Sequence, residues 1–250
     1  MGKSSIRYYN ECDRMANAMR LLDLRSGRQQ RRWSQKQAAA RLGLSQPYLS
    51  MLETGKRQLP ARLARKVTRV YCLPPTALPP SQPTFAPATT DPRALAEQLA
   101  ALGYPGLAYL GARRRRKNPG EVLLTALAQP NLEPRLVEAL PWLLLHHWDA
   151  DADWLVSQAK LYDLQNRLGF VVCLAARVSR RATPPDASRD RALGELEVRL
   201  ACSRLAREDT LCQASLSEAE RQWLRQNRSE EAKDWNLLTD WRAEVVRYDA

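Results

Sequence analysis

The chain has 250 residues, of which 44% are apolar and 26% are charged, and it contains seven tryptophans. This length and composition suffice for one large core or two ordinary ones, which excludes disorder throughout. The formal net charge is +12, and all of the excess lies in residues 1–80, which hold 16 Lys and Arg against four acids. Such a local excess favours a polyanionic partner, because each phosphate contact releases condensed counterions.

Several patterns argue against secretion, membrane insertion and metal binding. The N-terminus has no apolar signal-peptide core, and the most apolar run, residues 140–145, is too short to span a bilayer. The five cysteines are widely spaced and form no Cys-x-x-Cys pair, which is typical of reduced cytosolic thiols. We therefore expect a cytoplasmic protein with no membrane partner, no metal and no cofactor.

The N-terminal third is predicted to be helical. Residues 8–31 carry Met15, Met19 and Leu22 at a spacing that predicts a first helix. Beyond Pro60, the apolar residues Leu63, Val67 and Val70 share one side of a further helix.

Two short helices lie between these elements. Ser34 caps a helix over residues 35–42, Gly43 supplies the left-handed residue that ends it, and Ser45 caps a second helix that runs to about residue 53. Two short helices joined by a glycine-containing tight turn form a helix-turn-helix unit. The residues expected between these helices are apolar or small: Ala38, Ala39, Leu42, Leu44, Leu49 and Leu52.

This stretch resembles the XRE family of Cro-like repressors, over about residues 19–73. The resemblance rests on the Ser34-Gln35 helix start, Gly43, the Tyr48-Leu49-Ser50 sequence in the second helix, and the exit Glu53-x-Gly55-Lys56-Arg57. It implies that the second helix reads the major groove of double-stranded DNA, and that two copies act together as a homodimer.

The resemblance also implies which residues face the bases. Gln46 is the best direct reader, because an amide can bond adenine N6 and N7 together. Met51 offers only an apolar contact, such as one with a thymine methyl group, and Pro47 cannot hydrogen-bond a base. The implied base-reading residues are Ser45, Gln46, Pro47, Ser50 and Met51.

Other residues of the motif are expected to hold phosphates, which fixes register without reading sequence. These are Gln35, Ser45, Thr54, Lys56 and Arg57, with Arg25, Arg28, Arg31, Arg32 and Arg41 as further candidates. For Lys56 and Arg57 the alternative is an ordinary solvated turn. Phosphates would repel Glu53, so we expect it to pair with a neighbouring arginine or to cap backbone inside the domain.

Residues 74–92 contain seven prolines, which favours a semi-rigid extended linker. We predict a helix-turn-helix domain over 1–73, a linker over 74–92 and an α-helical dimerisation or partner-binding domain over 93–250. The pattern predicts helices over 91–102, 119–129, 133–147, 151–180, 188–208, 215–226 and 230–246. A strand over 170–174 is the one competitor, and the fold class is all-α.

The C-terminal part shows little chemistry. It has no glycine-rich phosphate loop, no zinc-protease motif and no nucleophile elbow, so we expect no enzyme. The residues from His146 to Asp153 gather two imidazoles and three carboxylates, but a helix end followed by an N-cap explains them better.

A basic run interrupts this part of the chain: Arg113, Arg114, Arg115, Arg116 and Lys117. It is either a solvated loop, a second DNA backbone contact or a clamp for an acidic protein. The apolar stripe of residues 154–180 is either core or a dimer interface. The tail with Trp223, Trp235 and Trp241 could dock a partner.

These observations predict a bacterial, sequence-specific transcriptional regulator, specifically an autoregulating repressor. The alternative is an antitoxin that represses its operon and neutralises a protein toxin, such as a nucleotidyltransferase, through its C-terminal helices. A third hypothesis is an enzyme that carries a DNA-targeting domain.

Overall fold

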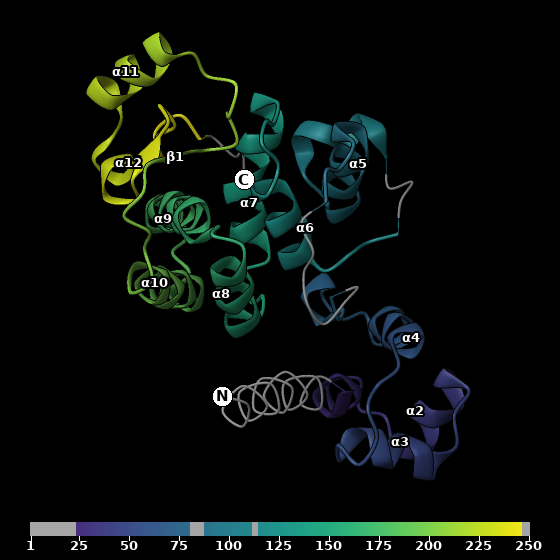
Figure 1. Cartoon of the computed structure of the whole chain (residues 1–250). Helices are drawn as coiled ribbons and strands as arrows, with labels where there is room; N and C mark the ends of the chain where they lie inside the picture. The colour runs from purple at the N-terminus through teal and green to yellow at the C-terminus, as the bar shows by residue number, and fades with distance from the viewer. Residues whose placement is uncertain (1–23, 81–87, 112–114, 247–250) are drawn as a thin grey trace, which may run out of the picture. The chain divides into compact units, whose positions relative to one another are not determined.

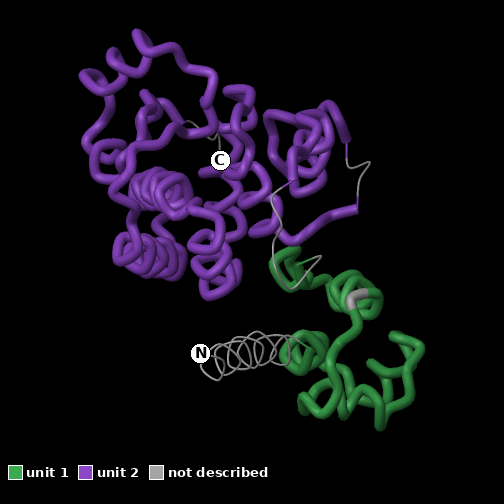
Figure 2. Tube along the Cα trace, viewed as in Figure 1, with its two compact units in different colours: residues 1–81 green, residues 82–250 purple. Residues whose placement is uncertain are grey.

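The computed structural model describes residues 24–80, 88–111 and 115–246, and these are mostly helical, which confirms the all-α class. The chain divides into two compact units (Figure 2): residues 1–81, called unit 1, and residues 82–250, called unit 2. Within the described ranges, no helix is long and apolar enough to cross a membrane.

The described part of unit 1 begins with a helical segment over residues 24–30. This is the described part of the helix predicted for residues 8–31, and Met15, Met19 and Leu22 lie outside the described residues. Three further α-helices and a short 3-10 helix follow (Figure 1): α2 (Gln35–Leu42), α3 (Gln46–Glu53), α4 (Ala61–Tyr71) and η1 (Pro75–Ala77).

The helix ends in unit 1 are the ones that the sequence predicts. Ser34 and Gln37 form a capping box, in which the Gln37 amide donates to Ser34 Oγ at 3.2 Å and the Ser34 amide donates to Gln37 Oε1 at 2.9 Å. Gly43 ends α2 with φ 65°, a conformation that glycine adopts without a Cβ penalty. Ser45 then caps α3, because its hydroxyl accepts from the Tyr48 amide.

The core of unit 1 lies between these helices. The residues predicted to face one another are buried or partly buried, and Leu49 and Ala38 are fully inaccessible. Lys66 on α4 closes one end of this core, because its Nζ donates to the Leu42 carbonyl at 2.6 Å at the C-terminus of α2.

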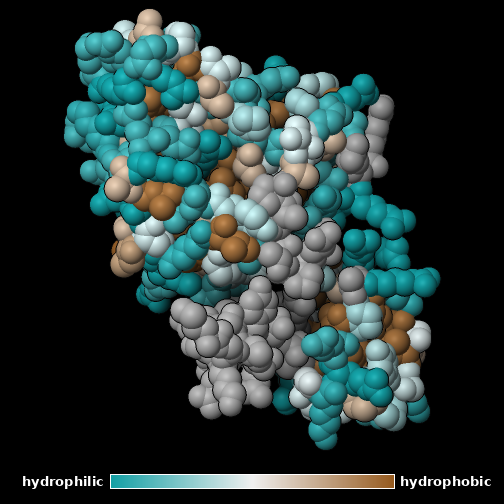
Figure 3. Space-filling model, in the orientation of Figure 1, coloured by the Kyte–Doolittle hydropathy of each residue, from teal (hydrophilic) through white to brown (hydrophobic). Residues whose placement is uncertain are grey.

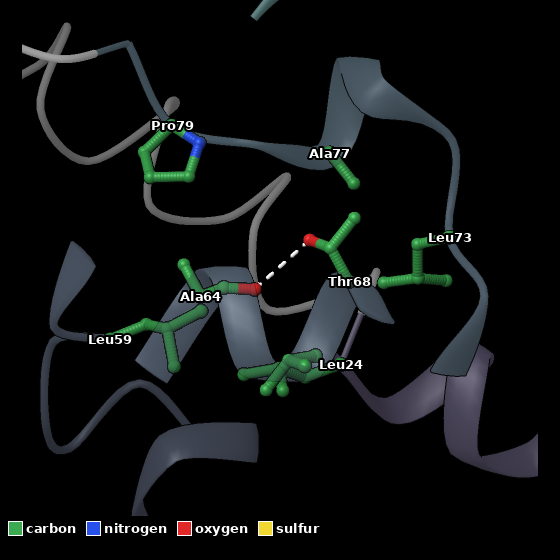
Figure 4. Close-up of a pocket in the computed structure, with 8 residues that line it drawn as sticks. Leu24, Leu59, Ala64, Thr68, Leu73, Ala77 and Pro79 are labelled. Carbon is green, nitrogen blue, oxygen red and sulfur yellow. Dashed lines mark hydrogen bonds between the residues drawn. The ribbon is translucent and has the colours of Figure 1, made fainter. Parts of the chain in front are cut away.

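The residues after α4 also pack onto unit 1. Leu78 is buried, and Ala77 and Pro79 line a small hollow beside Leu24 and Ala64 (Figure 4). The hollow has a volume of about 10 Å³, roughly room for one water, and its walls are mainly apolar, so it is a packing gap and not a ligand site. Packing thus continues beyond residue 73, the predicted end of the helix-turn-helix domain.

Unit 2 is built around α9, which packs against α7 and α10 and buries Leu168, Phe170 and Leu174 (Figure 1). Residues 170–174 are therefore helical and not a strand. The elements of unit 2 are α5 (Pro92–Leu102), η2 (Pro105–Leu110), α6 (Pro119–Leu127), α7 (Pro134–His146), α8 (Ala152–Leu161), α9 (Gln165–Arg181), α10 (Ala187–Ala201), β1 (Asp209–Thr210), α11 (Glu218–Asn227), α12 (Glu230–Asp234) and β2 (Leu237–Leu238).

The single helix predicted for residues 151–180 is wrong. The chain breaks between α8 and α9, where Asp163 has φ 56°, a left-handed conformation that ends a helix. The break turns Leu161 outward, with 56% of its surface exposed, while Leu164 and Leu168 stay buried. The apolar stripe is therefore shared by two helices instead of running along one.

The helices predicted for 188–208 and 230–246 also end early. Residues Asp209–Thr210 pair in parallel with Leu237–Leu238, which forms a two-stranded sheet. Leu237 and Leu238 are fully buried there, so tertiary packing overrides the helical pattern of the tail.

Arg167 on α9 ties β1 to the helical core. Its Nε and Nη2 donate to the two Asp209 carboxylate oxygens at 2.7 and 2.9 Å. Its Nη1 donates to the carbonyls of Leu127 and Gln129 at the end of α6. Burial alone would raise the pKa of Asp209, but the bonds from Arg167 outweigh it and hold this pKa below its ordinary value of 3.8.

This pair predicts a loss of stability in acid. A carboxylate with a depressed folded-state pKa contributes stability above its unfolded-state pKa, and that stability is lost as the pH falls through the folded-state value. We expect the free energy of unfolding of unit 2 to fall below about pH 4. Urea unfolding at several pH values should show that Asp209→Asn is destabilised at neutral pH and responds less to acid. An unchanged pH response in the variant would contradict this role.

Candidate nucleic-acid interface

The five predicted base-reading residues lie at the start of α3 and one turn later. Ser45, Gln46 and Pro47 are exposed, and Ser50 and Met51 are partly exposed. The opposite side of α3 is anchored in the core by Leu49 and Leu52, which are both buried. The helix therefore presents one accessible side, and the five residues lie on it.

Gln46 is held by a second glutamine. Its Nε2 donates to Oε1 of Gln35 at 2.7 Å, which joins the first residue of α3 to the first residue of α2. From the sequence alone, Gln46 is expected to contact a base and Gln35 a phosphate. The structure brings them together as one hydrogen-bonded pair.

Glu53, the last residue of α3, forms an ion pair with Arg28. Arg28 donates from Nε and Nη2 to the two carboxylate oxygens at 2.6 and 3.0 Å, and the two side chains are only 13% and 2% exposed. The hydrogen bonds that Arg28 donates to Glu53 raise the pKa of Arg28 above its ordinary value, so the guanidinium stays charged. The expectation that Glu53 pairs with an arginine is confirmed.

Hydrogen bonds join the ion pair to the partly buried Gln35 and, through it, to the exposed Gln46. Gln35 donates from Nε2 to the same carboxylate at 2.9 Å, so the bonds run from Arg28 through Glu53 and Gln35 to Gln46. Arg28 and Glu53 are largely buried, whereas the bond between Gln35 and Gln46 is exposed, and hydrogen bonds restrict the rotamers of the side chains that they join. The amide of Gln46 is therefore oriented before any ligand arrives, which reduces the entropy lost on binding.

Several arginines proposed for the DNA footprint have contacts inside unit 1 instead. Arg28 is largely buried, and Arg31 donates from Nε to the Tyr71 carbonyl at 3.2 Å. The Arg41 guanidinium lies 4.2 Å from the centre of the Trp33 ring. The sequence holds one signal for the inward position of Arg28. Residues 24–80 contain twelve Lys and Arg but only one acid, Glu53, so one of these cations is expected to pair with it.

The predicted phosphate contacts follow α3. Lys56 and Arg57 are exposed in the turn after Gly55, and neither takes part in an ion pair among the described residues. Thr54 is also exposed, but its hydroxyl donates to the Ser50 carbonyl at 2.8 Å. The Thr54 hydroxyl would have to give up that bond to donate to a phosphate.

The basic run of unit 2 is partly engaged in its own fold. Arg113 and Arg114 lie outside the described residues, and Arg115 is exposed. Arg116 donates from Nε to the Ala101 carbonyl at 2.9 Å, and Lys117 lies 3.5 Å from Glu121. Two of these cations therefore anchor the segment to α5 and α6.

The residues from His146 to Asp153 have the structural roles that the sequence suggested. His146 ends α7 and stacks on Trp142, and Asp151 caps α8 by accepting from the Trp154 amide at 2.9 Å. The described part of the chain contains no group of three His, Cys, Asp or Glu side chains that could hold a metal ion.

The capped helix pair, its left-handed glycine turn and the exposed basic surroundings of α3 define a DNA-binding helix-turn-helix domain. Residues 24–78 match the family model described as Helix-turn-helix, and this part of the chain is a domain of the XRE type. A domain of this type supports a DNA-binding transcriptional regulator of the XRE type. The family model does not extend into unit 2. Comparisons with curated proteins and with solved structures found no match.

Proposed function

We propose that the protein is a cytoplasmic, sequence-specific repressor that acts on its own operon by binding, with no catalytic step. The observation that carries this proposal is the bonded pair of Gln35 and Gln46 on the accessible side of α3, backed by the buried ion pair of Glu53. An oriented amide on an exposed helix is suited to read adenine in the major groove.

In this proposal α3 enters the major groove with its N-terminus first. Gln46 donates to adenine N7 and accepts from N6, while Gln35 holds the amide in position and contacts the adjacent phosphate. Lys56 and Arg57 neutralise phosphates on the backbone beside the groove. A homodimer would place two such helices about one turn of DNA apart, so the operator would be a near-palindrome.

The test is binding of the full chain to its upstream DNA, measured against salt and unrelated competitor DNA. We expect Gln46→Ala to weaken specific binding by about 1–3 kcal/mol, roughly fivefold to 150-fold, and to leave non-specific binding unchanged. Gln226→Ala is the matched control, because Gln226 is an exposed amide on α11 of unit 2. Equal affinity of Gln46→Ala and wild type for the upstream DNA would refute base reading by Gln46.

The second candidate function is that of an antitoxin whose unit 2 binds a toxin encoded beside it. Two exposed apolar side chains of unit 2 support it as anchors for a partner, Val198 at 65% and Trp223 at 54% exposed. On the face of unit 2 that Figure 3 shows, small apolar patches lie among mainly hydrophilic residues. Expression of the neighbouring gene alone discriminates the two functions, since only an antitoxin requires that its product be toxic.

A further inference from the structure

A hollow opens on unit 2 where three helices meet. It lies between the end of α7, the turn that follows it, the start of α8 and the middle of α10, and its volume is about 170 Å³. Its floor consists of Leu144, Leu155 and Leu196, which are all buried. Apolar walls of this kind gain free energy when an apolar group displaces water from them.

The hollow exists because small residues line it. Ala150, Ala152 and Ala192 contribute only methyl groups at positions where larger side chains would fill the space. Sites for whole small molecules usually enclose about 300–1,000 Å³, whereas an apolar cavity of about 150 Å³ accepts a single benzene ring. The hollow on unit 2 therefore matches one large side chain better than a complete metabolite.

The charges at the rim indicate what surrounds that side chain. Asp149 and Glu195 line the hollow and are exposed. Arg199 is the cation of the lining, and it is paired with Asp153 on α8. The charge of Arg199 is therefore offset by Asp153, whereas Glu195 takes part in no ion pair between described residues, so the rim at Glu195 is negative beside an apolar floor. Trp148 adds an aromatic ring that can contact a cation.

We propose that this hollow is a docking site for a partner protein, which inserts one large apolar side chain flanked by Lys or Arg. The proposal rests on the second candidate function, in which unit 2 binds a partner protein, and it does not involve the DNA-reading face of unit 1. A failure of peptide binding and a failure of operator binding are thus separate results.

The experiment uses the full chain with its alanine methyl groups labelled for NMR. The probe is the blocked tripeptide lysine-tryptophan-lysine, compared with lysine-serine-lysine, glutamate-tryptophan-glutamate and free tryptamine. We expect the first peptide to shift the methyl signals of Ala150, Ala152 and Ala192 in a saturable way. The serine and glutamate peptides should bind at least roughly tenfold more weakly, because each lacks one of the two complementary features.

Two variants test the site itself. Ala192→Leu fills the hollow, and Glu195→Lys reverses the rim charge without filling it, so a folding defect in the first leaves the second informative. Each should weaken the lysine-tryptophan-lysine peptide several-fold or more. Ala201→Leu, at an exposed position of α10 outside the hollow, and Asp240→Lys, at an exposed position outside the hollow, are the matched controls and should bind normally.

Three results would overturn the proposal. The first is no saturable shift at the three alanines, and the second is equal binding by wild type and both site variants. The third is tighter binding of free tryptamine than of the peptide, which would assign the hollow to a small cationic metabolite.

Discussion

Glu53→Ala should destabilise unit 1 by about 3–5 kcal/mol, because removal of one partner from a buried ion pair leaves the other charge without compensation. Arg28 is only 13% exposed and would keep its charge with no carboxylate beside it. Gln35 would lose the acceptor of its Nε2 at the same time. Urea unfolding followed by circular dichroism measures the change.

The same variant should also weaken operator binding, because Gln35 would no longer hold Gln46 in one orientation. Glu195→Ala is the matched control, since Glu195 is an exposed glutamate of unit 2, and it should change the stability of unit 1 by less than about 0.5 kcal/mol. The double variant Arg28→Met with Glu53→Leu removes both charges and should recover most of the lost stability. A loss below about 1 kcal/mol in Glu53→Ala would show that water reaches Arg28.

The DNA-binding domain could be predicted from the sequence because its signals are local. Ser34, Gly43 and Ser45 act on backbone groups within a few residues of themselves, so their roles can be inferred without knowing the fold. The contact between Gln35 and Gln46 was not predicted, because it joins two helices and depends on their crossing. The inward orientation of Arg28 has the same cause, since its partner lies 25 residues away.

Unit 2 was predicted less well where distant segments decide the structure. The pairing of β1 with β2 joins residues 28 positions apart in the sequence, and no alternating pattern marks either strand. The break at Asp163 has no glycine or proline to signal it, because an aspartate adopts the left-handed conformation there. The helices predicted for 91–102 and 215–226 are found because their start signals are local, and Asp91 and Ser217 cap α5 and α11 in the structure.

Gly169, in the second turn of α9, leaves room for the ring of Trp235 from the C-terminal tail. Alanine is usually better than glycine inside a helix by about 1 kcal/mol, so Gly169→Ala would be expected to stabilise α9. The structure predicts the opposite. A Cβ at Gly169 would lie 2.1 Å from Cζ3 and 2.2 Å from Cη2 of Trp235, whereas non-bonded carbons rest at about 3.5–4.0 Å. Trp235 is only 3% exposed and follows α12 directly, so its ring is enclosed by the core and has little room to move.

We therefore expect Gly169→Ala to destabilise unit 2 by about 3 kcal/mol, at the upper end of the usual cost of overpacking a core. Displacement of Trp235 into water should also shift the tryptophan fluorescence to the red, and thermal unfolding gives the stability. Gly194→Ala is the matched control, because a Cβ at this α10 position meets nothing within 4 Å, so this variant should gain up to about 1 kcal/mol. Trp235→Leu removes the ring that clashes with the new methyl group. Trp235→Leu should therefore cost much less stability in the Gly169→Ala variant than in the wild-type protein. Similar stability changes at both glycines would mean that the tail does not depend on the contact between Gly169 and Trp235.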